Sequence, residues 1–137
     1  MKLIKIIGHP YTVIISFLLL MISGEHLGGP YILYIMLALP YLAIHALLAI
    51  AGIILLLIVY KLVRSKVISI FLNIAAYASM LLSLYFFFSN DSAGYNDDTF
   101  YQPVPLFTFG LFAIILLASL IRSLYHSKVK VKTTTMT

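Results

Sequence analysis

Residues 31–66 decide the fold of this chain, and they read YILYIMLALPYLAIHALLAIAGIILLLIVYKLVRSK. Residues 31–60 contain no Asp, Glu, Lys or Arg, whereas the six residues that follow contain three cations. A bilayer core about 30 Å thick is crossed by about 20 apolar helical residues. The stretch therefore predicts a membrane-spanning helix that ends in a short basic link.

The apolar run 31–60 is too long for one crossing, because a helix of that length would measure roughly 45 Å. Pro40 divides it, and a proline inside a helix removes one hydrogen bond and clashes with the preceding turn. We expect a helix kinked or broken near Pro40, or a separate interfacial piece from Tyr31 to Leu39. Tyr31, Tyr34 and Tyr41 suit the outer membrane interface, where amphipathic rings lie at headgroup level.

Three further apolar stretches lie outside this region, at about 10–27, 67–89 and 104–125. The chain has 137 residues, of which 63% are hydrophobic and 9% are charged. Because soluble domains carry roughly 25% charged residues, this composition excludes a water-soluble globular protein, and its hydrophobicity excludes a disordered one. We predict an all-α integral membrane protein with a single four-span domain, residues 1–126, and a basic, threonine-rich tail, residues 127–137.

If the chain crosses the membrane four times, its positive and negative charges lie on opposite sides of the membrane. All basic residues then lie on one side of the membrane: Lys2, Lys5, Lys61, Arg64, Lys66, Arg122, Lys128, Lys130 and Lys132. All acidic residues lie on the other: Glu25, Asp91, Asp97 and Asp98. The positive-inside rule then places both termini in the cytoplasm, and short links predict an up-down four-helix transmembrane bundle. A cleaved signal peptide is an alternative for the first span, but Met21 and Ser23 make a poor cleavage site.

Small and weakly polar residues recur at helical spacing in each span, which is typical of helix contacts in lipid. In the second and third spans this packing stripe comprises Ala43, Ala46, Ala49, Gly52, Ser69, Asn73 and Tyr77. In the fourth it comprises Thr108, Phe112, Ile115, Ser119 and Arg122. These stripes predict packing within the bundle or against another subunit.

Two polar residues inside the spans are candidates for function. His45 is a candidate because ionisable residues in membranes often relay protons or bind ligands. The favoured interpretation is a neutral His45 bonded to a neighbouring helix, since no span contains a carboxylate. Asn73 should face inward, where it could pair with His45 or with a hydroxyl of the first span, and it is expected to act mainly in packing.

Glu25 and His26 form a candidate pair on the outer side, where they could hold a metal or exchange protons. A solvated turn beside glycines is the preferred interpretation, because two ligands make no closed metal site. The chain has no cysteine, which excludes thiolate chemistry. We therefore predict no catalytic, cofactor or metal site, no enzyme activity and no nucleic-acid binding.

The function is argued by exclusion. The favoured hypothesis is an accessory subunit that packs against partner membrane proteins. The alternative is a homo-oligomeric channel or transporter, or a membrane-disrupting effector, with a polar seam that includes His45 and Asn73. The bacterial inner membrane is the default location for so compact a chain.

Overall fold

The structure is a computed structural model that describes residues 6–23, 28–90 and 96–134, with side chains described up to residue 124 except at 97 and 98. The chain is mostly helical. Three helices are long and apolar enough to cross a membrane: α4 (Ile44–Leu62), α5 (Lys66–Ser89) and the part Pro103–Leu124 of α6 (Pro103–Thr134). Their length and composition are those of an integral membrane protein.

Helices α4 and α5 form an antiparallel hairpin around a link of three residues, 63–65. Two serines of α5 join it to the backbone of α4. The Ser79 hydroxyl donates to the Leu48 carbonyl at 2.8 Å, and the Ser83 hydroxyl donates to the His45 carbonyl at 2.6 Å. These bonds set the register between the two helices.

The two helices approach most closely at Gly52, which is buried. A Cβ atom at this position would lie 2.9 Å from Met80 Cγ and 3.0 Å from the Ala76 carbonyl oxygen. Ala46 and Ala49 are fully buried on the same helix. The small residues predicted to pack on α4 are therefore largely buried, and Gly52 packs directly on α5, where dispersion contacts supply the attraction that lipid does not.

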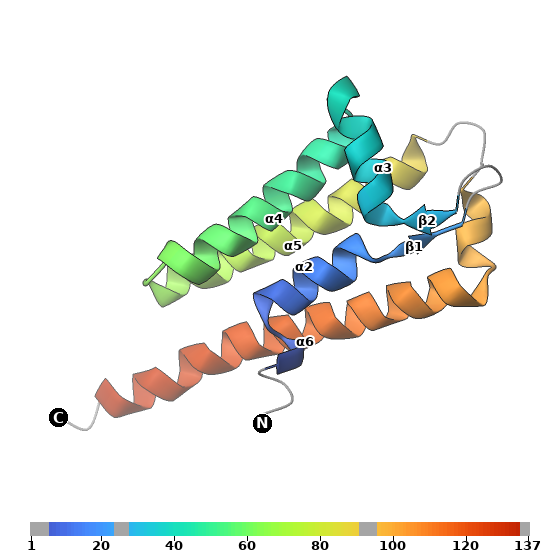
Figure 1. Cartoon of the computed structure of the whole chain (residues 1–137). Coiled ribbons are helices and arrows are strands. Elements are labelled where there is room, and N and C mark those ends of the chain that lie inside the picture. The colour runs from blue at the N-terminus through green and yellow to red at the C-terminus, as the bar shows by residue number, and fades with distance from the viewer. Residues whose placement is uncertain (1–5, 24–27, 91–95, 135–137) are drawn as a thin grey trace.

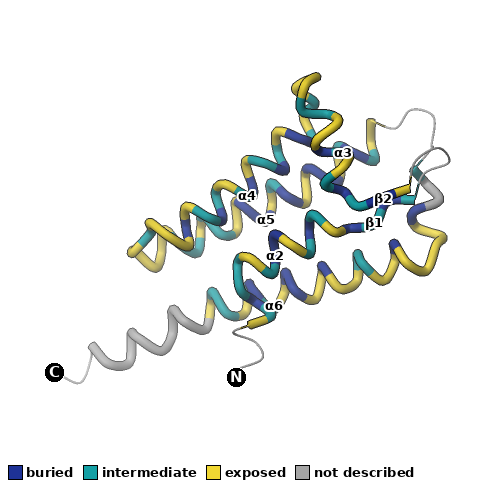
Figure 2. The backbone as a smooth tube through the Cα atoms, in the orientation of Figure 1, coloured by how far each residue is buried: buried dark blue, intermediate teal, exposed yellow. Residues whose placement is uncertain are grey.

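The remaining helices complete two packed pairs (Figure 1). The short helix α2 (Pro10–Leu18) lies along α6, and this pair packs beside the α4–α5 hairpin. Aromatic rings fill the space between the pairs: Phe17 packs on Tyr31 and Phe112, and Tyr31 packs on Phe87, with ring centroids 5.3–5.6 Å apart. Figure 2 shows buried positions on the facing sides of the helices and exposed positions outside.

The first predicted span, 10–27, is not one continuous helix. Pro10 opens α2 after His9, whose ring accepts a bond from the Tyr11 amide, but the helix ends at Leu18. The chain then becomes extended, and strand β1 (Met21–Ile22) pairs antiparallel with β2 (Gly29–Pro30). Residues 24–27 lie outside the described residues.

Two threonines stabilise this extended backbone. Thr108 Oγ1 accepts from the Met21 amide at 3.1 Å. Thr99, on the 3-10 helix η2 (Asp97–Phe100), accepts from the Ser23 amide at 3.0 Å and donates to the Ser23 carbonyl at 2.9 Å. Non-helical backbone at membrane depth is tolerated only where such partners exist. The helix can therefore end early, because side chains from other elements satisfy the backbone beyond it.

The apolar run 31–60 consists of two helices rather than one. Helix α3 (Tyr31–Ala38) continues into the 3-10 helix η1 (Leu39–Tyr41), and the chain turns at Leu42 before α4 begins. Tyr31 was expected at the outer interface, but it is fully buried, and its hydroxyl lies 2.8 Å from Ser83 Oγ. That placement was wrong because the ring fills the space between α2 and α5.

The helix of the fourth predicted span extends further than expected, although its apolar part, Pro103–Leu124, agrees with the predicted 104–125. Helix α6 continues to Thr134, through residues assigned from sequence to a tail that begins at 127. This stretch contains no glycine or proline that would end a helix.

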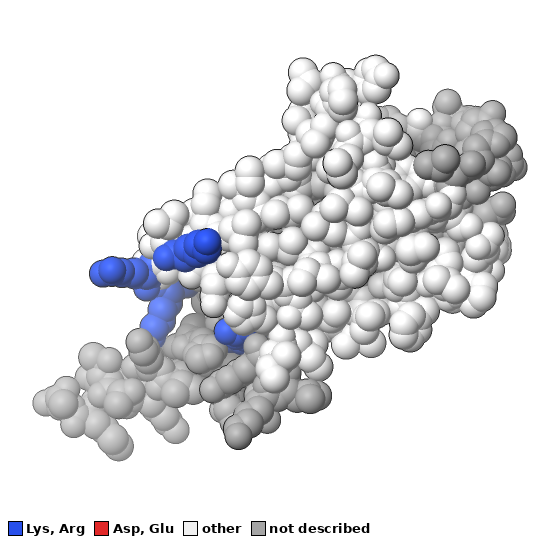
Figure 3. All heavy atoms as spheres, in the orientation of Figure 1, with Lys and Arg blue, Asp and Glu red and all other residues white. Residues whose placement is uncertain are grey.

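Basic residues gather at one end of the molecule, hereafter the basic end (Figure 3). Lys61, Arg64 and Lys66 lie at or beside the α4–α5 link, and Arg122 lies far along α6. The start of α2 is at the same end (Figure 1). Strands β1 and β2 and the 3-10 helix η2 lie at the opposite end. The described cationic side chains thus lie at one end of the long axis of the bundle.

Replacing Gly52 by alanine is expected to destabilise the protein by about 1–3 kcal/mol, because the new methyl group overlaps backbone and side-chain atoms of α5. Gly110→Ala is the matched control, since nothing lies within 4 Å of a Cβ built at that position. It should be neutral, or stabilising by up to about 1 kcal/mol through helix propensity. Thermal unfolding in detergent micelles measures both. Equal effects of the two substitutions would contradict the close α4–α5 packing.

Candidate functional site

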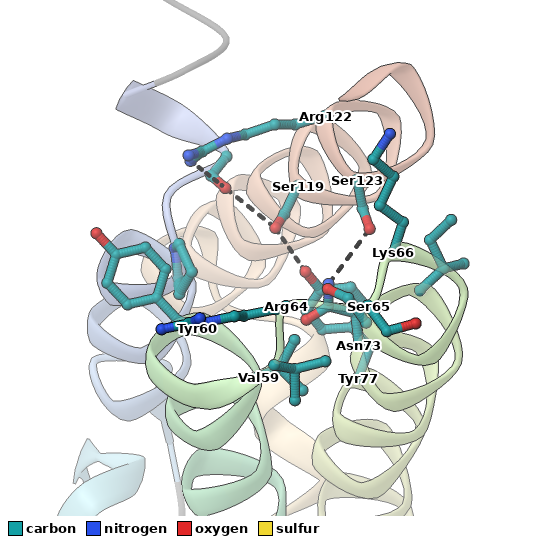
Figure 4. A pocket seen from close by; sticks show the side chains of 15 residues that line it. Val59, Tyr60, Arg64, Ser65, Lys66, Asn73, Tyr77, Ser119, Arg122 and Ser123 are labelled. Carbon is teal, nitrogen blue, oxygen red and sulfur yellow. Dashed lines mark hydrogen bonds between the residues drawn. The ribbon is translucent and has the colours of Figure 1, made fainter. Parts of the chain in front are cut away.

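A cavity of about 320 Å³ opens at the basic end, where α2, α4, α5 and α6 meet (Figure 4). We call it the basic-end cavity. Its cationic lining residues are Arg64, Lys66 and Arg122. Its polar lining residues include Ser65, Ser69, Asn73, Tyr77, Ser119 and Ser123. No carboxylate is among the residues that line it, so its described wall combines positive charge with hydroxyl and amide groups.

A buried hydrogen-bond network fixes one wall of the cavity. The Gly8 carbonyl accepts from Ser119 Oγ at 3.1 Å and from Arg122 Nη1 at 3.2 Å. Ser119 Oγ also lies 2.6 Å from the Tyr77 hydroxyl, and both residues are buried. Figure 4 shows Arg122, Ser119 and Tyr77 connected by successive hydrogen bonds at the cavity. The network ties the segment before α2 to α5 and α6, and it holds the Arg122 guanidinium at the cavity.

Asn73 belongs to this cavity rather than to a seam with His45. Its side-chain amide donates to Ser123 Oγ at 3.2 Å. The His45 carbonyl accepts a bond from Ser83. Ser83 lies ten residues after Asn73 on α5, which is about 15 Å along the helix axis. The pairing of Asn73 with His45 that the sequence allowed is not formed, because the antiparallel register puts them at different depths.

The His45 ring lies near the start of α4. It packs edge-on against Phe87, with ring centroids 5.3 Å apart. Its Nε2 atom is buried and has no hydrogen-bond partner among the described residues. The expected bond from this nitrogen to a neighbouring helix is therefore not made. Instead, the backbone carbonyl of His45 accepts the interhelical bond from Ser83.

The other predicted site residues divide into three groups. Glu25 and His26 lie outside the described residues. Ala43 is half-buried and Ala46 fully buried in the α4 stripe, whereas Ser69 and Tyr77 line the basic-end cavity together with Asn73. Within the residues that the structure describes, no group of three or more His, Asp or Glu side chains is positioned to hold a metal ion.

Sequence reasoning missed several residues of this site. The Gly8 carbonyl is a backbone acceptor, which no side-chain pattern reveals. Ser123 follows Arg122 and was not recognised as part of the inward face, although it lies one helical turn beyond Ser119. Spacing from Ser119 was the signal that would have found it.

No protein-family model matches the chain, and neither a curated protein nor a solved structure matches it.

Ser119→Ala should destabilise the protein by about 1–3 kcal/mol, since it removes a buried partner of the Tyr77 hydroxyl and of the Gly8 carbonyl. Ser65→Ala is the control, because Ser65 is exposed and its side chain makes no capping bond to α5. Thermal unfolding in detergent compares the two variants. A Ser119→Ala protein as stable as the control would show that the network contributes nothing.

His45→Phe should leave stability unchanged or raise it by about 1–2 kcal/mol, because phenylalanine keeps a ring beside Phe87 and removes an unpaired buried nitrogen. Chemical denaturation in mixed micelles measures the difference. A clear loss of stability would mean that the His45 nitrogens make a bond that the bundle needs.

Proposed function

We propose that this chain is an accessory subunit that packs against a partner membrane protein, and that the contact is made by the α3 arm, residues 31–42. The arm comprises α3, η1 and the turn at Leu42, and it projects from the side of the bundle near the start of α4 (Figure 1). The proposal rests on how this arm is anchored and on the conformation of its tip.

The root of the arm is rigidly held. Tyr31 is 0% exposed and Ile35 is 4% exposed, and the Tyr31 hydroxyl is bonded to Ser83. Beyond this root, the arm exposes large apolar side chains: Tyr41 is 84% exposed and Leu42 is 69% exposed. An anchored element that ends in exposed aromatic and aliphatic side chains is the kind of preorganised surface that protein contacts use.

Leu42 is the observation that carries the proposal. Its φ is 51°, and among the described residues it is the one non-glycine residue with positive φ. The Leu42 amide bonds to the Leu39 carbonyl and the Ala43 amide bonds to the Ala38 carbonyl, which is the bonding of a Schellman motif. Glycine usually occupies this position, and a leucine there costs about 1–2 kcal/mol. A strained leucine whose side chain points outward suggests that a contact outside the chain uses that side chain.

The proposal also includes the number of membrane crossings and the orientation of the termini. Helix α2 supplies about 14 Å and the extended residues 19–23 about 16 Å, which together match the bilayer core. With α4, α5 and α6 this makes four crossings in an up-down bundle. The positive-inside rule then puts the basic end and both termini in the cytoplasm, and the bacterial inner membrane remains the default location.

A pore along the polar seam has less support. Ser79 and Ser83 are used in bonds between α4 and α5, and Asn73 is bonded to Ser123. The space between the helices is filled by apolar side chains such as Phe17 and Met80, both fully buried. These groups hold the chain together instead of lining a path for ions.

Native mass spectrometry of protein extracted gently from its own membrane tests the subunit proposal. The wild type is expected to carry a second protein. The double substitution Tyr41→Ala with Leu42→Gly should lose that protein while unfolding at the same or a higher temperature, because glycine relieves the strained turn. Phe71→Ala, which trims a 69% exposed ring of α5, is the control and should keep the partner.

Other outcomes contradict the proposal in distinct ways. A partner retained by the arm variant would place the contact elsewhere on the bundle. A homo-oligomer without a second protein would support the channel alternative and call for flux measurements in liposomes. Loss of membrane potential on expression alone would support the effector alternative.

A further inference from the structure

We propose that the basic-end cavity binds the phosphate headgroup of an anionic phospholipid. This site goes beyond the partner contact proposed for the α3 arm, and it lies on different elements. Three observations support it: the charges and donors that line the cavity, its position relative to the membrane-spanning helices, and an apolar groove on the same face of α6.

The charges of the cavity suit a phosphate group. Arg64, Lys66 and Arg122 line it, and no carboxylate is among its lining residues. Arg122 is held in place by the Gly8 carbonyl, so little side-chain freedom is lost when it binds. Guanidinium groups bind phosphate oxygens through paired hydrogen bonds, and an ammonium group adds charge. The described lining thus combines three cations with no carboxylate, which favours an anion.

The cavity also contains donors that are not cations. The N-terminus of the 24-residue helix α5 borders it at Ser65 and Lys66, and the Ser65 side chain does not cap that helix. Amide groups at a helix N-terminus favour anions. The hydroxyl of Ser69 also lines the wall, one turn further along α5. At about 320 Å³, the cavity is at the small end of ligand pockets, which suits a headgroup rather than a large solute.

The position of the cavity favours a lipid as the source of the phosphate. The cavity lies beside the last turn of α4 and the first turn of α5, where both apolar helices end. Lipid phosphates occupy this level of a bilayer. This position therefore favours a lipid phosphate over a soluble one.

A second feature provides a place for an acyl chain. A groove of about 290 Å³ runs between α2 and α6, lined mainly by apolar side chains that include Ile15, Leu19, Leu111 and Ile115. Arg122 lies on the same face of α6 as Ile115, seven residues and about 10 Å nearer the basic end. A phospholipid whose phosphate sits at Arg122 can therefore extend a chain toward this groove.

Lipid retention tests the proposal, with phosphatidylglycerol as the anionic probe and phosphatidylcholine as the zwitterionic one. Each is added to delipidated protein in detergent, and native mass spectrometry counts the bound lipid. Wild-type protein should bind phosphatidylglycerol about tenfold more tightly than phosphatidylcholine. Arg64→Gln and Lys66→Gln should each remove most of that preference, and both residues are exposed, so the fold should persist.

Two controls distinguish lipid binding in the cavity from lipid binding to a charged surface. Lys61→Gln removes an exposed cation at the same end that does not line the cavity, and it should keep the preference. Ser69→Phe fills the cavity without changing charge, and it should abolish the preference. Equal effects of Lys61→Gln and Lys66→Gln, or no effect of Ser69→Phe, would overturn the proposal.

Inorganic phosphate distinguishes the source of the ligand. Millimolar phosphate should neither displace phosphatidylglycerol nor raise the unfolding temperature of the wild type. If phosphate alone stabilises the wild type but not Lys66→Gln, the site binds a soluble phosphate and the lipid assignment is wrong. Equal binding of the two phospholipids by the wild type would also overturn it. Neither result depends on whether the α3 arm binds a partner.

Discussion

The structure depends on one constraint: a backbone that leaves its helix inside the packed bundle must still satisfy its amide and carbonyl groups. After Leu18 the chain becomes extended, and Thr108 and Thr99 bond the backbone at Met21 and Ser23. These threonines lie nearly eighty residues or more away in the sequence. The extended backbone of the first segment is therefore held by α6 and by the 3-10 helix that precedes it, and this dependence makes the bundle a single unit.

Tyr31 connects the segment after α2 to the rest of the molecule. Its amide donates to the Leu20 carbonyl at 2.7 Å, and its hydroxyl reaches Ser83, whose own hydroxyl bonds the His45 carbonyl. One residue thus connects the segment after α2, the α3 arm and the α4–α5 hairpin. The bundle is tightly packed around this residue, whereas its polar cavity lies at the basic end. The two proposed contacts, one through the arm and one through the cavity, therefore use opposite ends of the same bundle.

Much of the architecture could be predicted from residue patterns. The length of the apolar runs predicted α4, α5 and α6, and Pro40 marked where the run 31–60 divides. The early end of α2 could not be predicted, because its sequence stays apolar beyond Leu18 and the bonds that replace the helix come from distant threonines. For the site, Asn73, Tyr77, Ser119 and Arg122 were assigned to packing stripes, but two of their partners were not. Ser123 and the Gly8 carbonyl join them only through the packing of α5, α6 and the segment before α2.

By itself, the sequence determined that this is a helical membrane protein with its basic residues confined to alternate links, since hydropathy and charge act locally along the chain. Only the tertiary structure decided that the first segment is partly extended. It also decided that Tyr31 is buried while Leu42 is exposed in a strained turn. Finally, it brought the cations of α6 and of the α4–α5 link to one cavity. Each of these depends on the register between helices. That register follows from contacts such as Met80 packed on Gly52 and from the Ser79 and Ser83 bonds to the α4 backbone, and these join residues that no sequence periodicity relates.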